Sequence, residues 1–317
     1  MMNPKTLQEA VIFFDDSDNC LNYFISRRWP NGVICPNCGR DDVTFLTSQK
    51  KWQCKSSHKQ RQFSAKVGTI FEDSPLGLCK WLLAVWMVTN CKNGVSSYEI
   101  SRHIGVTQKT AWFMAHRIRV AMTTSSFEKF SGEVEADETF IGGKGRNMHQ
   151  AAKIARKVSN KGGAAHMTSV MGVIQRRGRV RATITKTSGE KVLREIIDNY
   201  VERGSHLYTD QARQFQNLGE DYIHWVINHS YEYVRENVHT NSIENFWSLL
   251  KRTIRGTYVS VAPEHLQKYI EEQTFRFNER KGTDGERFHK VTSQFAGKRL
   301  TYAELTGKTP EAYKLSL

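Results

Sequence analysis

The stretch EVEADETFIGG, residues 133–143, reads as a β-strand with a carboxylate, Asp137, in its middle. Further acids flank it at Glu133, Glu135 and Glu138. A carboxylate without a partner is costly to bury on a central strand, so it persists where a cation compensates its charge. A divalent metal ion is the usual candidate for that cation. The stretch therefore predicts a strand of the main sheet and one side of a metal site.

A second stretch has the same arrangement. SHLYTD, residues 205–210, is an apolar strand pattern that ends in Asp210 where the chain turns. Each aspartate alone is explained more often as an ordinary turn or cap residue. They indicate a shared site only if a third acid joins them.

The third acid comes from VHTNSIENFWSLLKR, residues 238–252, which predicts an amphipathic helix. Its apolar stripe consists of Ile243, Phe246, Trp247, Leu250 and, one turn on, Ile254. The polar stripe beside it consists of Asn241, Glu244, Ser248, Lys251 and Arg255. Glu244 and Lys251 are about two turns apart, which places them on one face at roughly 10 Å from each other.

Two aspartates on strands and a glutamate on a helix match a two-magnesium site for phosphoryl transfer. Such a site needs hard oxygen ligands that converge from different elements and leave room for water and phosphate oxygens. Lys251 would then contact the DNA backbone beside the scissile phosphate. In the alternative, the helix face is merely solvated, and Asp137 and Asp210 are turn or cap residues. The combination of the three acids favours catalysis.

The region from Ser131 onward alternates short strand patterns with helical ones. The strand-like runs are residues 132–143, 166–177, 179–187 and 205–210, and the helical runs are residues 189–203, 241–255 and 263–280. This order predicts a mixed α/β domain.

A metal site of another kind is predicted near the N-terminus. CPNCGR supplies Cys35 and Cys38, and WQCKSSHKQRQFS supplies Cys54 and His58 after an intervening loop. Two such pairs match a tetrahedral zinc site with three cysteines and one histidine. A small β-rich segment has little core of its own, so the metal would supply its folding energy. A chance cysteine pair with a surface histidine is the less specific explanation.

Residues 95–119, VSSYEISRHIGVTQKTAWFMAHRIR, have the layout of a helix-turn-helix. Ser96 or Ser97 can cap the first helix, Gly105 permits a tight turn, and Thr107 can cap the second helix. Two sets of side chains would then meet DNA: Gln108, Lys109 and Thr110 at the base edges, and His116, Arg117 and Arg119 at the phosphates. The alternative is a plain helical hairpin inside a bundle.

Charge and composition agree with a nucleic-acid partner. The 317 residues carry a formal charge of +14, which favours a polyanion, with nucleic acid ahead of an anionic membrane. The longest strongly apolar run, residues 81–88, is too short to span a bilayer. The N-terminus does not have the pattern of a signal peptide. Three clustered and three scattered cysteines argue against a disulfide framework and predict a reducing cytoplasm.

The order of these motifs resembles the insertion-sequence transposases of the DDE superfamily, in the group with an N-terminal zinc ribbon. The resemblance runs from about residue 20 to about residue 290 and rests also on QFSAKVGTIFEDSPLGL, residues 62–78. It implies an RNase H-like catalytic domain that uses Mg²⁺ or Mn²⁺ and follows a Zn²⁺ ribbon. The residues that it implies are Asp137, Asp210 and Glu244 as the metal-binding triad, Asn241 beside them, and Lys251 and Arg252 on DNA. The third metal ligand varies in that group among Glu, Asn and His, so Asn241 and His239 stay open as alternatives to Glu244.

We accordingly expect four parts: residues 1–75 with the zinc ribbon, 76–127 with the helix-turn-helix, 128–300 as the catalytic domain, and 301–317 as a tail. The expected partner is double-stranded DNA, both terminal inverted repeats and target DNA, bound by a homodimer or higher multimer. The expected activity is cleavage of element ends and joining of the 3′ ends to target DNA. The alternatives are a non-catalytic DNA-binding regulator and a nuclease of the same fold that cuts without joining.

Overall fold

The computed structural model describes residues 3–123, 128–143, 167–187, 189–227 and 239–307. These residues fall into two compact units. The first joins the chain up to Thr123 with residues from Glu279 onward, and the second lies between them, from Thr124 to Asn278. Residues 308–317, the end of the expected tail, lie outside the described residues.

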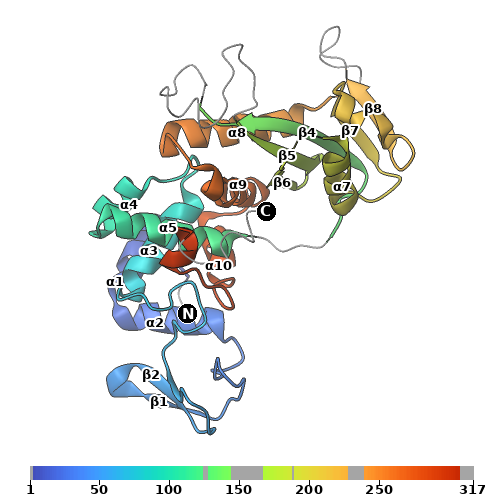
Figure 1. Cartoon of the computed structure of the whole chain (residues 1–317). Coiled ribbons are helices and arrows are strands. Elements are labelled where there is room, and N and C mark those ends of the chain that lie inside the picture. The colour runs from blue at the N-terminus through green and yellow to red at the C-terminus, as the bar shows by residue number, and fades with distance from the viewer. Residues whose placement is uncertain (1–2, 124–127, 144–166, 188, 228–238, 308–317) are drawn as a thin grey trace. The chain divides into compact units, whose positions relative to one another are not determined.

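The second unit, as far as it is described, is built on one sheet of five strands (Figure 1). The strands are β4 (Glu133–Ile141), β5 (Thr168–Gln175), β6 (Val180–Ile184), β7 (His206–Asp210) and β8 (Ile223–Ile227). Their order is β6-β5-β4-β7-β8. The β4–β5 and β5–β6 pairs are antiparallel, whereas the β4–β7 and β7–β8 pairs are parallel. The strand that carries Asp137 is therefore the central one.

Helices cover both faces of this sheet. The helix α7 (Glu190–Tyr200) packs on one face, and α8 (Asn241–Thr253) with α9 (Pro263–Asn278) packs on the other. Alternation along β4 explains the division, because Val134 and Ala136 join the core under α7 while Ile141 joins the core under α8. A mixed sheet flanked by helices fits an RNase H-like domain, as expected.

The edge strand β8 was not predicted from the sequence. Ile223, Trp225 and Val226 in it are all more than two-fifths exposed, so the strand lacks a clear apolar-in, polar-out pattern. A short helical segment, η3 (Arg213–Leu218), precedes it.

The first unit is mainly helical. Its helices are α1 (Leu7–Asp15), α2 (Ser17–Arg28), α3 (Leu78–Asn90), α4 (Ser97–Ile104), α5 (Gln108–Met122), α10 (Asp284–Thr292) and α11 (Tyr302–Leu305). Aromatic side chains fill its core; Phe288 of α10, for example, lies 5.0 Å from Trp86 of α3 between ring centroids. We expected the catalytic domain to run to residue 300. The compact unit ends instead at Asn278, because α10 packs on α3.

A small antiparallel ribbon completes the first unit. It consists of β1 (Val43–Leu46), η1 (Thr47–Gln49), β2 (Lys51–Cys54) and β3 (Gln62–Phe63). No helix among the described residues is long and apolar enough to cross a membrane.

Candidate functional site

The four predicted zinc ligands meet in the ribbon. The sulfur atoms of Cys35, Cys38 and Cys54 and a ring nitrogen of His58 all lie within 4.8 Å of one another. The Cys38 and Cys54 sulfurs are 3.6 Å apart, and the Cys35 sulfur is 3.5 Å from Nε2 of His58. Thiolates bound at about 2.3 Å to one tetrahedral zinc stand roughly 3.8 Å apart, so this spacing fits zinc. Within the described parts of the chain, it is the one group of three or more ligands placed to hold a metal.

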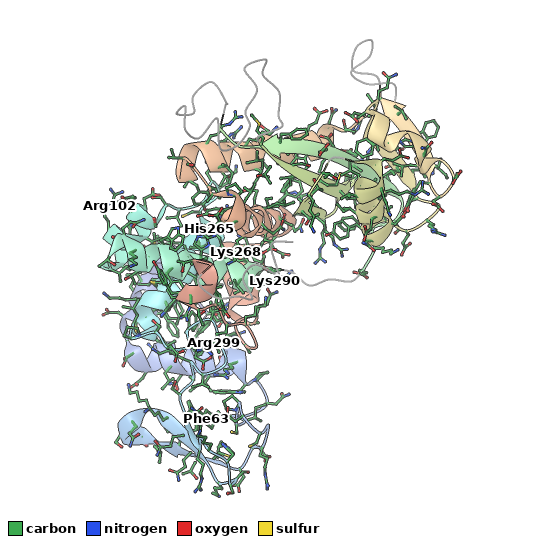
Figure 2. The ribbon with its side chains drawn as sticks, in the orientation of Figure 1. Phe63, Arg102, His265, Lys268, Lys290 and Arg299 are labelled. Carbon is green, nitrogen blue, oxygen red and sulfur yellow. The ribbon has the colours of Figure 1, made fainter. Side chains whose placement is uncertain are left out.

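The ribbon has little other structure to hold it together. Phe63, labelled in Figure 2, lies in the ribbon. It stacks on Trp52 with ring centroids 6.0 Å apart, and Trp29 packs edge-on against both rings. A tight turn closes the first ligand pair, with Gly39 at φ 73° and its N–H bonded to the Cys35 carbonyl. The N–H of Arg40 lowers the pKa of the Cys38 thiol, which favours the thiolate that binds metal.

In the second unit, Asp137 and Asp210 lie on neighbouring parallel strands. Glu135 of β4 pairs with Tyr208 of β7, and the aspartates are each two residues farther along. Because side chains alternate with a period of two, both aspartates point to the same face of the sheet. Asp210 is at the carboxyl end of β7, and Asp137 is in the middle of β4. Backbone N–H groups hold their Oδ1 atoms: that of Glu138 at 2.8 Å from Asp137, and that of Ala212 at 3.1 Å from Asp210.

Trp247 of α8 holds the other oxygen of Asp137. Its indole N–H donates to Asp137 Oδ2 at 2.9 Å, and its ring lies over Gly172, the β5 residue paired with Asp137. A Cβ atom at residue 172 would lie 2.5 Å from that ring, so only glycine allows this close approach. Glu244 is one turn before Trp247, and its Oε1 accepts from the Thr240 hydroxyl at 3.0 Å.

The charges of these acids act on one another. Burial raises the pKa of Asp137 to about 6, and repulsion from Asp210 and, to a smaller extent, from Glu244 adds to the rise. The pKa of the half-buried Lys251 is lowered, mainly by burial and also by Arg255, although the charge of Asp137 opposes this. A half-buried carboxyl that is repelled by two other acids would gain from a multivalent cation. In the described structure, however, the three acids are not drawn together into a group of metal ligands.

Glu135 anchors α8 to the central strand, a role that sequence reasoning missed. It is fully buried, and its Oε2 accepts from the N–H groups of Ser242 at 2.9 Å and Ile243 at 3.0 Å. These are among the first N–H groups of α8, which normally need a cap from the helix itself. In the described structure the Thr240 side chain, at the cap position, makes no such bond. Its hydroxyl bonds Glu244 instead.

Arg176, just after β5, compensates the buried charge of Glu135. Its Nε lies 2.9 Å from Glu135 Oε1, its Nη2 donates to the His239 carbonyl at 2.7 Å, and its guanidinium lies 3.8 Å from the Tyr208 ring centroid. One side chain therefore links β4, β5, β7 and the start of α8. The period-two pattern puts Glu135 on the same face as Asp137, and this signal in the sequence could have revealed it.

The fold and the zinc ribbon agree with the comparisons to known proteins. Residues 129–278 match the family described as the ISXO2-like transposase domain, and residues 15–60 match the transposase zinc-ribbon domain.

The chain belongs to this transposase family.

This transposase is 28% identical to a protein of Halobacterium salinarum described as "Uncharacterized protein in transposable element ISH50". The match extends over 261 residues, 78% of this chain and 86% of that protein. An "Uncharacterized transposase-like protein" of Haemophilus influenzae is 30% identical over 101 residues, 32% of this chain and 81% of that protein.

In the transposase, α4 begins and ends, and α5 begins, at the residues that the sequence predicts. Ser96 and Glu99 form a reciprocal cap, Gly105 adopts φ 61° in the turn, and Thr107 caps α5. Of the three residues expected at base edges, Lys109 is exposed, Thr110 is half-buried, and the Gln108 amide donates to Ser97 at 2.9 Å. Arg102 of α4 projects into solvent (Figure 2).

The structure corrects the prediction that three cationic side chains of α5 contact the phosphates of a duplex. His116, Arg117 and Arg119 are 0%, 3% and 2% exposed, because this stretch of α5 is inside the helical unit. Arg117 Nε donates to the Leu300 carbonyl at 2.9 Å. These three side chains do not present an open surface to a duplex.

The remaining predicted residues lie along α8. Asn241 and Glu244 in its first turns and Arg252 near its end are exposed, and Lys251 is half-buried. The His239 ring, just before the helix, lies 3.4 Å from Glu135 Oε1.

Removal of zinc should unfold the ribbon and leave the rest folded. The cluster of Trp29, Trp52 and Phe63 is a small core for the ribbon, so Cys54→Ala or a chelator should abolish its cooperative structure. Amide hydrogen exchange of residues 30–63 is the measurement, with Cys91→Ala as the matched control. Unchanged protection of the ribbon without zinc would contradict the assignment.

Glu135→Leu should destabilise the second unit by about 3–5 kcal/mol, because it leaves Arg176 buried without its partner and α8 without its cap. Glu133→Gln is the matched control, since Glu133 is on the same strand and also pairs with Arg176 but is half exposed. That exposed pair should contribute less than about 1 kcal/mol. Equal effects of the two variants in urea unfolding would refute the anchoring role.

Asp137→Asn should stabilise the metal-free protein at neutral pH. Folding raises the pKa of this carboxyl from 3.8 to about 6, so the folded protein loses stability as the pH rises between those values. The variant should therefore be more stable by up to about 3 kcal/mol above pH 6, with a gain that disappears near pH 4. Thermal unfolding in EDTA at both pH values measures this difference in stability. A variant that is less stable than the unaltered protein at pH 7 would show that the charge of Asp137 does not destabilise the fold.

Proposed function

We propose that this transposase cuts DNA at the ends of its element and joins the 3′ ends to target DNA, with Asp137, Asp210 and Glu244 as ligands of Mg²⁺. The observation that carries the proposal is the half-buried Asp137 beside Asp210 on the neighbouring strand, with the pKa of Asp137 raised by burial and by repulsion from the other two acids. A fold gains nothing in stability from such a group, so a role in holding cations accounts for it.

Two phosphoryl transfers make up the proposed reaction. In the first, the oxygen of water bonds to a phosphorus at the element's end and the bond to the 3′ oxygen breaks, which leaves a 5′ phosphate and a 3′ hydroxyl. In the second, that 3′ hydroxyl bonds to a phosphorus of target DNA and displaces the 3′ oxygen of the cut target strand. When bound, a pair of magnesium ions would activate the attacking oxygen and stabilise the leaving oxygen.

The protein's own residues would position these groups. Trp247 and the Glu138 N–H fix the two oxygens of Asp137, and the Ala212 N–H fixes Asp210. Glu135 holds α8, and with it Glu244, at the central strand. Lys251, whose charge interacts with that of Asp137, would bind a phosphate beside the cations, and the exposed Arg252 would extend the contact.

Glu244 is the better candidate for the third ligand than His239 or Asn241. The charge of Glu244 acts on Asp137, whereas the His239 ring faces Glu135. Asn241 is exposed at the first position of α8 and offers a neutral amide. A carboxylate is the harder ligand for magnesium.

We further propose that the zinc ribbon and the α4–α5 pair recognise the terminal inverted repeats, with the exposed Lys109 at the start of α5. Since two ends are cut and joined together, the active form would be at least a dimer. The proposal makes the first 127 residues the DNA-recognition part and the RNase H-like unit the catalytic part.

Asp137→Asn, Asp210→Asn and Glu244→Gln should each lower magnesium-dependent cleavage of element-end DNA by roughly two orders of magnitude or more. End binding should persist, since the recognition elements are untouched. Strand cleavage and strand transfer on labelled oligonucleotides are the measurements. The exposed Glu202→Gln is the matched control, and His239→Ala and Asn241→Ala test the alternative third ligands.

Full cleavage by any of the three acid variants would remove that residue from the triad. DNA binding without cleavage by the unaltered protein would favour the regulator. Cleavage without joining would favour the nuclease.

A further inference from the structure

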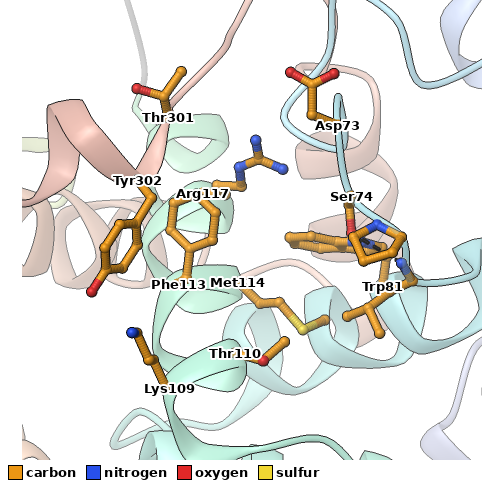
Figure 3. A pocket seen from close by; sticks show the side chains of 12 residues that line it. Asp73, Ser74, Trp81, Lys109, Thr110, Phe113, Met114, Arg117, Thr301 and Tyr302 are labelled. Carbon is orange, nitrogen blue, oxygen red and sulfur yellow. Dashed lines mark hydrogen bonds between the residues drawn. The ribbon is translucent and has the colours of Figure 1, made fainter.

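The helical unit contains a cavity that the proposed reaction does not use. It has a volume of about 480 Å³ and lies between residues 73–76, α5 and residues 301–302 (Figure 3). This volume is in the range of sites that bind small ligands. The start of α5, which we place at DNA, forms part of its lining.

Aromatic and aliphatic side chains make most of the wall. They are Pro75, Leu76, Trp81, Phe113, Met114 and Tyr302. Trp81 is 1% exposed and Tyr302 is 38% exposed, so the wall runs from the core of the unit to its surface. Rings at different depths around a cavity provide faces on which a flat, aromatic group can stack.

A buried cation faces this cavity. Figure 3 shows the Arg117 guanidinium between Phe113 on one side and Asp73 and Ser74 on the other. Its Nε bonds the Leu300 carbonyl, and no described residue accepts a hydrogen bond from its Nη atoms. These Nη atoms are not among the buried side-chain atoms left without a partner, so they are open to the cavity. An open guanidinium in a largely apolar wall is the feature that points to an anionic ligand.

The nearby acid does not meet this need. Asp73 lines the cavity, but its Oδ2 accepts from Arg299 Nη2 at 2.6 Å. A second cation stands at the rim, where the Lys109 ammonium lies 5.1 Å from the centroid of the Tyr302 ring. The cavity therefore offers two cations and one acid that is already paired.

The walls are held in place before any ligand binds. The Lys66 ammonium donates to the carbonyls of Ser74 and Leu76, both at 2.8 Å. The Trp81 indole N–H donates to the Ser74 hydroxyl at 2.9 Å. A cavity with fixed walls needs little reorganisation to bind its ligand.

We propose that this cavity takes up one unstacked nucleotide of the bound DNA, with its base among the rings of Trp81, Phe113 and Tyr302 and its phosphate at Arg117 and Lys109. The inference rests on the proposed binding of DNA by this unit. A nucleotide satisfies both features of the cavity, because it joins a flat aromatic group to an anion. The chain's charge of +14 favours this polyanion over an acidic peptide.

The test compares two duplexes that are identical except for one additional unpaired 2-aminopurine in one strand. The full-length protein should bind the duplex with the additional nucleotide about ten-fold more tightly, since stacking of one base on aromatic side chains contributes an effect of that size. The fluorescence of the 2-aminopurine should fall on binding, as the base stacks.

Tyr302→Ala should lose this preference and keep its affinity for the fully paired duplex. Arg117→Met should lose the preference as well, with circular dichroism to check that the buried substitution folds. Trp225→Ala is the matched control, since Trp225 is an exposed ring on the edge strand β8 that does not line the cavity, and it should keep the preference.

Equal affinity of the unaltered protein for both duplexes would overturn the inference and leave the proposed function intact. A preference that persists in both variants would also overturn it. Failure to bind either duplex would contradict the proposed function itself.

Discussion

The second unit depends on one buried contact, in which Glu135 of the central strand accepts the first N–H groups of α8. A helix normally takes its cap from the residue just before it in the sequence. Here the cap comes from β4, so the strand and the helix cannot move independently. Because Arg176 pairs with the same carboxylate, the buried charge is compensated and β5 joins the contact.

The face of β4 that carries this contact also carries Asp137, which we assign to metal binding. Two residues from the compensated Glu135, Asp137 accepts a hydrogen bond from Trp247 and makes no ion pair with a described residue, although the charge of Lys251 acts on it. The two acids face the same helix and differ in their partners. The first uses its charge to fix the helix, whereas the second keeps an unbalanced charge that we assign to metal binding.

Much of this could be predicted from the sequence, where short-range pattern decides the outcome. Zinc ligand spacing, the caps of α4 and α5 and the strand that carries Asp137 are local features, and the structure agrees with each. Long-range packing decides the rest. Nothing near Arg117 in the sequence indicates that Leu300 accepts its hydrogen bond, and nothing near residue 279 indicates that α10 returns to α3. Glu135 accepts from the N–H groups of Ser242 and Ile243, which come 107 and 108 positions later in the sequence.

The most direct test of the central claim is anomalous diffraction from crystals of the protein with Mn²⁺ and a DNA end. The account predicts manganese bound by carboxylate oxygens of Asp137, Asp210 and Glu244 at roughly 2.2 Å, with α8 still capped by Glu135. Manganese bound at other side chains, or a third ligand supplied by His239 in a helix released from Glu135, would contradict it.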